Sequence, residues 1–275
     1  MSLSIFTNSA SMASTNAMNK SNNLLSTAME RLGTGKRINS AADDAAGLQI
    51  ATRLQGQTNG MTVAQRNISD ATAMLQTAEG AFDEVSNIMY RMKDLATQAA
   101  NDTNSDDDRT AIGAEMTELQ NELVNIMDNT KYAGDNLFTG GKLEGEMNFQ
   151  IGSSTDEKLT VDVSGQLSNI DVSGLSIDVT DFDNAQATIS GLEEAIANVG
   201  TMRSALGANI NRLGHTAANL ANMKDNTDLA LGNIQDADYA TEASTMSRNQ
   251  LLAQTSMSML KQSNSMSSMV MSLLG

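Results

Sequence analysis

Few side chains in this sequence could carry out chemistry, and they are not grouped. The chain has one histidine, His215, and no cysteine. A metal cluster of several histidines, a thiolate nucleophile and a disulfide are therefore excluded. His215 lies close to Leu213 in a helical pattern, which is typical of an ordinary polar position on a helix surface.

The two Gly-Lys pairs resemble a phosphate-binding loop only superficially. That loop needs a glycine five positions before the Gly-Lys pair and a Ser or Thr directly after it. Gly35-Lys36 has Glu30 and Arg37 at these positions, and Gly141-Lys142 fails the same test. Neither pair is expected to bind a nucleotide.

The acidic residues that occur in pairs and runs are placed to start helices. Asp43 and Asp44 are adjacent, so on a helix they point in different directions and do not form an acid–base pair. Ser40 followed by Asp43 three residues later indicates a capping box. Residues 106–108 are all Asp, and they follow Ser105, a preferred N-cap residue. The sequence thus predicts no catalytic residue, no metal site, no cofactor and no enzymatic activity.

Two long helices are expected to position everything else. Alternate steps of four and three residues from Ile50 to Ala99 meet 15 positions, of which 14 are apolar; this is the spacing of a helix that packs against another helix. Similar spacing runs from Ile189 to Ile234. The chain contains no proline, which suits long helices because proline removes a helix hydrogen bond.

Between these helices the apolar pattern changes from helical to alternating. Residues 147–151 and 159–163 alternate apolar and polar side chains around a turn, which predicts a β-hairpin. Residues 175–179 alternate likewise and predict a third strand. The fold is predicted as mainly α, with long heptad-patterned helices from both ends of the chain packed as a coiled coil or helix bundle. A small β-hairpin region lies in the middle. The near-palindromic order predicts that the chain folds back so that its long helices pair and its ends meet.

Both ends of the chain are amphipathic helices that a slender monomer cannot bury. Residues 3–32 keep heptad spacing. Near the other end, one seam carries apolar residues at heptad positions: Tyr239, Met246, Met257, Leu260, Met271 and Leu274. A second seam beside it carries Leu252, Met259, Met266, Val270 and Leu273. Chain ends fray unless something binds them. These seams therefore predict that the chain polymerises with itself.

Charge is distributed unevenly along the chain. Residues 1–50 hold three acids and four bases, and residues 236–275 hold three acids and two bases. Residues 51–235 therefore carry the whole net charge of −16. Nucleic acid is not expected as a partner, because phosphate binding needs clustered Lys and Arg. Neutral, apolar ends and an acidic middle predict buried ends and a solvated middle.

No targeting segment is visible. Residues 1–16 lack the basic start and the apolar run of a signal peptide. No run approaches the roughly 18 apolar residues of a membrane span, so no membrane partner is expected. These rules alone would predict a cytosolic chain.

The two ends carry motifs that resemble those of bacterial flagellin. Residues 30–47 (ERLGTGKRINSAADDAAG) resemble the N-terminal signature of that family, ERLSSGxRINSAxDDAAG. Residues 238–242 (DYATE), followed by Met246-Ser247-Arg248, resemble its C-terminal signature. The resemblance covers roughly residues 1–140 and 185–275.

This resemblance implies a secreted, extracellular protein that polymerises into the filament of the bacterial flagellum for swimming or swarming. It implies export of the unfolded, uncleaved chain through the flagellar type III secretion channel. Residues 1–39 and 236–275 would form the two halves of the filament-core helical domain. Residues 40–180, with the small β element, and residues 181–235 would form an outer helical domain.

The resemblance also implies partners. These are other copies of the chain, the flagellar cap and hook-associated proteins, an export chaperone on the C-terminal segment, and the flagellin-sensing toll-like receptor of innate immunity. Residues 90–98 resemble the family segment QRVRELAxQ, so the receptor contacts would be Arg91, Leu95 and Glu115. Because Arg91 and Leu95 are four apart, we expect them to share one exposed helix face.

Two other interpretations stay open. A hook–filament junction protein of the flagellum shares the terminal design. A coiled-coil signalling or adhesion module, which is a different class of protein, fits the heptads but not the apolar, uncharged ends.

Overall fold

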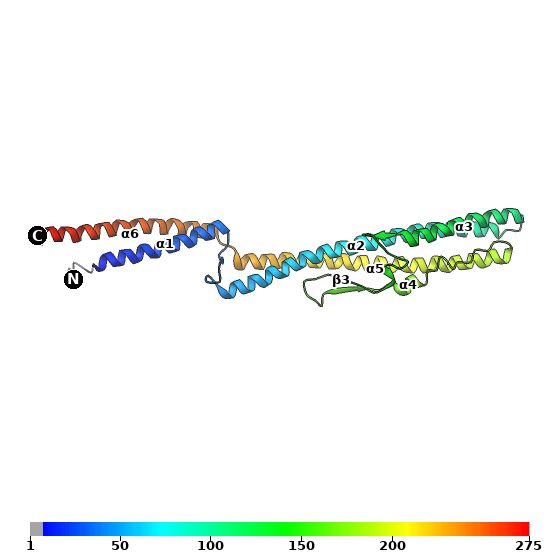
Figure 1. The fold of residues 1–275 in the computed structure, drawn as a ribbon, viewed down its shortest axis with the longest axis horizontal. Helices are drawn as coiled ribbons and strands as arrows, with labels where there is room; N and C mark the ends of the chain where they lie inside the picture. The colour runs from blue at the N-terminus through cyan, green and yellow to red at the C-terminus, as the bar shows by residue number, and fades with distance from the viewer. Residues whose placement is uncertain (1–7, 275) are drawn as a thin grey trace. The chain divides into compact units, whose positions relative to one another are not determined.

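The computed structural model describes the backbone of residues 8–274 and the side chains of residues 8–266, 268 and 269. Long helices dominate it (Figure 1): α1 Ser9–Thr34, α2 Ala45–Ala99, α3 Asp106–Asn129, α5 Phe182–Gln235 and α6 Tyr239–Leu274. Two short helices, η1 Lys142–Glu144 and α4 Ser164–Ser168, lie between α3 and α5 together with short strands. The predicted mainly α fold with a small β region is confirmed.

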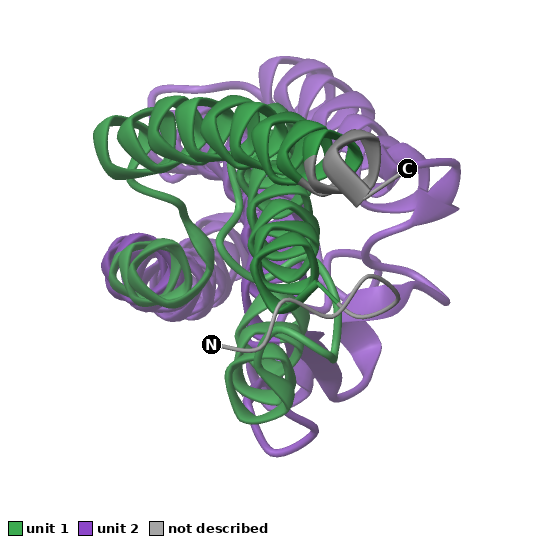
Figure 2. Ribbon diagram, turned by 90° about the vertical axis from the view of Figure 1, so that its left-hand side faces the viewer, with its two compact units in different colours: residues 1–56, 226–275 green, residues 57–225 purple. Residues whose placement is uncertain are grey.

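The chain forms two compact units (Figure 2). Residues 1–56 and 226–275 make up one, called here the terminal unit, and residues 57–225 make up the other, called the middle unit. Helices α2 and α5 each contribute to both units. Each unit thus combines residues from the two halves of the chain, which confirms that the chain folds back and brings its ends together.

The middle unit contains the large hydrophobic core. Phe82, Met92 and other members of the α2 seam are fully buried, together with residues of α3, α5 and the β region. The ring centroids of Phe82 and Phe138 lie 4.7 Å apart. Ion pairs join α2 to both neighbouring helices, Arg91 to Glu115 on α3 and Glu79 to Arg203 on α5, each at 2.8 Å. Helix α2 therefore packs on two sides, and its buried stripe is wider than a two-helix seam.

The start of α3 is as predicted, whereas the start of α2 is not. Ser105 Oγ accepts from the N–H of Asp108, and Asp108 Oδ2 accepts from the N–H of Ser105, so the capping box is present. The Ser40–Asp43 pair is also hydrogen-bonded (2.9 Å), but within a turn that precedes α2. Asp44 instead accepts from the third N–H of the helix at 2.8 Å. The predicted N-cap, Ser40, was therefore wrong by four residues, because Asp44 caps α2.

The predicted β-hairpin is confirmed. Strand β3 (Met147–Gln150) pairs antiparallel with β4 (Lys158–Val161). The hairpin loop lies directly on α2: a Cβ added at Gly60 would come within 2.7 Å of Ser153 Cβ. Glycine at position 60 is what permits this close approach.

A second, smaller ladder was not predicted. Strands β1 (Lys131–Tyr132) and β2 (Asp135–Asn136) pair around a two-residue turn. Ala133 and Gly134 in this turn have φ values of 53° and 96°, which is typical of the turns that join tightly paired strands.

The predicted third strand at residues 175–179 is wrong. The segment keeps its alternating burial, but no strand pairs with it. Gln120 Nε2 of α3 donates to the carbonyl of Leu175 (2.9 Å), and Thr188 Oγ1 of α5 accepts from the N–H of Asp178 (3.2 Å) and donates to its carbonyl (2.8 Å). Helix side chains thus satisfy backbone groups that a strand neighbour would otherwise satisfy.

Candidate assembly surface

Helices α1 and α6 run antiparallel and pair within the terminal unit (Figure 1). The residues buried where they meet are small or polar: Ser21 and Ala28 on α1, and Asn249 and Ser263 on α6. Asn8 Nδ2, just before α1, donates to Ser263 Oγ at 2.8 Å. Such side chains let two helices approach closely but bury little apolar area, so these four residues contribute little hydrophobic stabilisation.

Many large apolar side chains of both helices stay exposed beside this contact, whereas others, such as Leu25 and Leu260, are half-buried. On α1, Met12 and Met29 are more than half exposed. The exposed large apolar residues of α6, called here the outer face, are between 47% and 64% exposed: Tyr239, Leu251, Leu252, Met257, Met259, Met266 and Met269. Leu252, Met259 and Met266 are seven residues apart and form one line along the helix. The outer face is thus an apolar surface that stays about half open to solvent in the described part of the chain.

A short clasp joins the two linkers of the terminal unit. The N–H of Arg37 donates to the carbonyl of Gln235 (2.6 Å), and the N–H of Ala237 donates to the carbonyl of Gly35 (2.9 Å). Gly35 ends α1 with a φ of 73°, a left-handed conformation that favours glycine. Sequence reasoning did not identify this clasp, although its residues lie in or beside the two quoted end motifs.

Two side-chain interactions support the clasp. Arg31 of α1 pairs with Glu242 of α6 at 3.0 Å, and their side chains are only 27% and 13% exposed. Asp238 precedes α6 and accepts hydrogen bonds from the Thr241 hydroxyl (2.8 Å) and the Ala240 N–H (2.9 Å). These hydrogen bonds hold the pKa of the Asp238 carboxyl below its ordinary value, and the bond from the Thr241 hydroxyl has the largest effect.

The members of the predicted polymerisation seam differ in exposure along α6. Tyr239 and Met257 belong to the outer face, whereas Met246 and Leu260 are half-buried. The side chains of Met271 and Leu274 lie outside the described residues. The predicted second seam corresponds better to the outer face, because it contains the line of Leu252, Met259 and Met266.

The three predicted receptor residues are not all accessible. Arg91 and Glu115 form an exposed ion pair, with 56% and 48% of their side chains accessible. Leu95 is 3% exposed and belongs to the core. The expectation that Arg91 and Leu95 share an exposed face was therefore wrong, because α3 and α5 together bury more of α2 than a two-helix seam would. The receptor contact itself stays a prediction.

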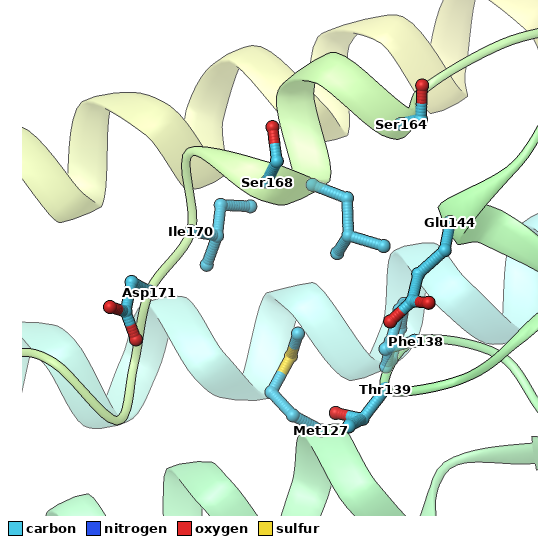
Figure 3. A pocket seen from close by; sticks show the side chains of 9 residues that line it. Met127, Phe138, Thr139, Glu144, Ser164, Ser168, Ile170 and Asp171 are labelled. Carbon is cyan, nitrogen blue, oxygen red and sulfur yellow. The ribbon is translucent and has the colours of Figure 1, made fainter.

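The middle unit has a cleft between the end of α3, η1 and α4 (Figure 3). Its two carboxylates, on Glu144 and Asp171, lie on opposite sides of the cleft. Glu144 Oε1 accepts from the N–H of Gly140 (2.7 Å) and Asp171 Oδ1 from that of Gly174 (2.7 Å). Both carboxylates therefore stabilise local turns. Within residues 8–274, no three side chains of the metal-binding types gather into a possible ion site, and no helix has the length and apolarity of a membrane span.

Comparison with known protein families identifies the family to which this chain belongs. A sequence model described as the bacterial flagellin N-terminal helical region matches residues 5–142, and one for the C-terminal helical region matches residues 189–274. The flagellin of Halalkalibacterium halodurans is 39% identical over 248 residues, which is 90% of each chain. The chain belongs to the bacterial flagellin family. A second flagellin, from Listeria innocua, is 34% identical over 95% of this chain and 96% of its own.

Solved structures agree with this membership of the flagellin family. The crystal structure of Bacillus cereus flagellin has a TM-score of 0.50 at 30% identity and covers 56% of this chain and 88% of that one. A protein described as flagellar hook-associated, from Vibrio parahaemolyticus, has a TM-score of 0.57 at 16% identity, over 70% of this chain and 100% of that one. The second likeness shows a shared fold alone.

Proposed function

We propose that this chain is a structural subunit of the bacterial flagellar filament, and that it polymerises with itself outside the cell. Its membership of the flagellin family supports the role as a filament subunit. The single observation that supports polymerisation in this chain is the inverted terminal pair: the buried residues of α1 and α6 are small or polar, and many of their large apolar side chains are exposed. The proposed role needs no catalytic step.

The outer face is large enough to drive assembly. Fully burying one Leu or Met side chain contributes about 1.5–3 kcal/mol. The outer face offers six such side chains, together with Tyr239, on α6 alone. Even partial burial of this set by neighbouring copies can therefore offset the entropy lost on association. Contiguous exposed apolar residues of this kind are typical of interfaces rather than of free surfaces.

The domain layout follows from the same reasoning. Residues 1–39 and 236–275, which carry the apolar ends, would form the filament core. Residues 40–180 and 181–235 would form the outer helical domain, whose net charge suits a solvated surface. The boundaries of the terminal unit, at residues 56 and 226, support an N-terminal half and a C-terminal half that fold together.

Further partners belong to the proposal. The apolar terminal helices of this flagellin would also meet the cap and hook-associated proteins at the filament ends. Before export, the outer face of α6 would need cover, which fits a chaperone on the C-terminal segment. The exposed Arg91–Glu115 pair is the part of the receptor motif that a toll-like receptor could contact directly.

A variant with a polar outer line tests the proposal. Leu252→Gln, Met259→Gln and Met266→Gln together keep good helix formers at exposed positions, so the helical content of the monomer should not change. We expect the critical concentration for polymerisation, measured by sedimentation, to rise about tenfold or more, because three apolar contacts per subunit are lost. Met223→Gln, at an exposed methionine of the middle unit, is the matched control and should polymerise normally. Equal critical concentrations for all three proteins would contradict the proposal.

A further inference from the structure

Two groups of methionines in this chain have contrasting environments. Most of those in the middle unit are at most 8% exposed: Met61, Met74, Met89, Met92, Met116, Met127 and Met202. Those on the faces of α1 and α6 that point away from the helix pair are between 49% and 60% exposed: Met12, Met29, Met257, Met259, Met266 and Met269. We call the second group the terminal methionines. These residues are about half exposed in the part of the chain that the structure describes, and they lie on the surface that assembly would bury.

Exposed thioethers react with peroxides. The sulfur lone pair attacks one oxygen of hydrogen peroxide. An S–O bond forms as the O–O bond breaks, and the departing hydroxide takes the proton of the transferred oxygen and leaves as water. Methionine is oxidised to its sulfoxide, the peroxide is reduced, and the net charge of the side chain does not change. The product is a polar acceptor in place of an apolar group. Burying such a group without a hydrogen-bond donor is unfavourable.

Several hydroxyls beside the terminal methionines of α6 are already engaged and are not free to pair with a buried sulfoxide. Ser258 Oγ donates to the carbonyl of Gln254 (3.1 Å), Ser265 Oγ to that of Gln262 (2.9 Å), and Ser268 Oγ to that of Ser265 (2.8 Å). Met259 and Met266 lie in one line with Leu252, so each sulfoxide would interrupt the same apolar strip. Every copy in a polymer repeats that interruption.

We propose that the terminal methionines form an oxidation-sensitive assembly switch: peroxide oxidation of the unassembled chain blocks its addition to a filament, whereas assembled subunits are protected. The proposal rests on the polymerisation proposed above and adds its regulation by oxidants. Because sulfoxides can be reduced enzymatically, the block is reversible. The core methionines of the middle unit stay reduced, so the modified chain keeps its fold.

The test is limited oxidation of purified full-length monomer with hydrogen peroxide. Peptide mass spectrometry should find sulfoxides at the terminal methionines and not at buried residues such as Met92 and Met202. The critical concentration should rise about tenfold or more, with unchanged helical circular dichroism. The same peroxide applied to assembled filaments should oxidise the terminal methionines far more slowly. Equal oxidation rates in monomer and filament, or normal polymerisation of a fully oxidised monomer, would overturn the proposal.

A leucine variant separates these methionines from other oxidation targets. Met257→Leu, Met259→Leu, Met266→Leu and Met269→Leu keep the apolar volume but cannot form sulfoxides. After peroxide treatment this variant should show at most about a threefold rise in critical concentration. Met223→Leu, the control in the middle unit, should stay as sensitive as the parent chain. Sensitivity of the fourfold variant equal to that of the parent chain would contradict the switch.

Two further experiments distinguish methionine oxidation from other causes of failed polymerisation. Treating the oxidised parent chain with methionine sulfoxide reductases should restore polymerisation, whether or not the leucine variant assembles. Failure of restoration, with the thioethers shown to be re-formed, would assign the block to other damage and overturn the proposal. Failure of the untreated parent chain to polymerise would instead count against the proposed function.

Discussion

At the scale of single residues, the structure separates two arginine–glutamate pairs that the sequence alone does not distinguish. Arg31–Glu242 lies where the helices of the terminal unit meet and is mostly screened from solvent, and the Arg31 Nε has no hydrogen-bond partner. Arg91–Glu115 is about half exposed on both sides. A charged side chain that is shielded from water depends on its ion-pair partner far more than an exposed one does.

The shielded pair yields a stability prediction. Glu242→Ala should lower the stability of the α1–α6 pair by about 1–2 kcal/mol, because the half-buried Arg31 guanidinium loses its charged partner. Amide hydrogen exchange of residues 9–34 in the free chain would measure the loss. Glu115→Ala is the comparison, and its effect on α2 and α3 should stay below about 1 kcal/mol. Equal effects of the two substitutions would contradict this reasoning.

The exposed pair yields a prediction on receptor recognition. Arg91→Ala with Glu115→Ala should reduce toll-like receptor signalling by the monomer, because both side chains are accessible. The helical content should change little, since exposed substitutions usually shift stability by no more than about 0.5 kcal/mol. Receptor-bearing cells exposed to monomer give the readout. Undiminished signalling by the double variant, or no signalling by the parent chain, would show that the site is not used here.

At the scale of helices and strands, the apolar period predicted much of the fold, and neighbouring elements account for the rest. The α2 heptads, the Ser105 capping box and the hairpin depend on local patterns, so they were predictable. The strand expected at residues 175–179 failed because alternation indicates burial on one side, not the identity of the neighbour. Gln120 and Thr188, distant in sequence, replaced the strand partner.

The assembly surface was predicted in kind but not in detail. Heptad counting found apolar residues on α6 but could not tell which of two adjacent seams faces α1. The deciding residues are small: Asn249 and Ser263 interrupt the apolar pattern and are buried all the same. They pack against α1, whose own buried residues, Ser21 and Ala28, are also small. If the small residues of α6 had been interpreted as its contact with α1, its large apolar residues would have been predicted to lie on the exposed side of the helix pair.

This small-residue contact should not tolerate a larger side chain. Ala28 is 1% exposed, so Ala28→Leu should force α1 and α6 apart and destabilise their pairing by about 1–3 kcal/mol. Met29→Leu, at the next position but exposed, should have almost no effect. Thermal unfolding, monitored by hydrogen exchange of the α1 amides, would compare the two variants. Equal stability of the two variants would mean that Ala28 does not set the helix spacing.

The start of α6 should respond to pH in a predictable direction. Hydrogen bonds lower the pKa of Asp238 in the folded chain, so its ionised form stabilises the fold. That contribution is present above the ordinary Asp pKa of about 3.9 and is lost as pH falls through the lower folded value. Asp238→Asn keeps a capping side chain but does not titrate.

The measurement is helical circular dichroism of the parent chain and the asparagine variant as the pH falls from about 5 to about 2.5. The parent should lose more helix than the variant over this interval, because only the parent loses an ionised cap. Identical pH profiles, or a larger loss in the variant, would contradict the role of the Asp238 carboxylate.

At the scale of the whole molecule, the two units differ in how they are stabilised. The middle unit has a continuous apolar core. The terminal unit relies on small-residue contacts, the clasp and one shielded ion pair. Local opening requires less free energy where fewer apolar contacts are buried. The terminal helices should therefore open without unfolding of the middle unit.

Limited proteolysis of the dilute monomer tests this difference. Cleavage should remove roughly the first and last 40 residues and leave a resistant fragment that contains α3 and most of α2 and α5. The same protease applied to filaments should spare the ends, because neighbouring copies would cover the outer face. Early cleavage within residues 61–99, before the ends are removed, would contradict this order of stability.

The clasp also has a consequence for how the chain closes on itself. Asn8 and Ser263 are separated by 255 residues, and joining such distant points in an unfolded chain costs entropy that grows with the logarithm of the loop length. Once residues 35–37 and 235–237 are paired, however, each further contact between α1 and α6 closes a loop of only a few residues. The pair can therefore form like a zipper, from the clasp outward. Its last contacts, at Asn8 and Ser263, form at the free ends and are the first to part.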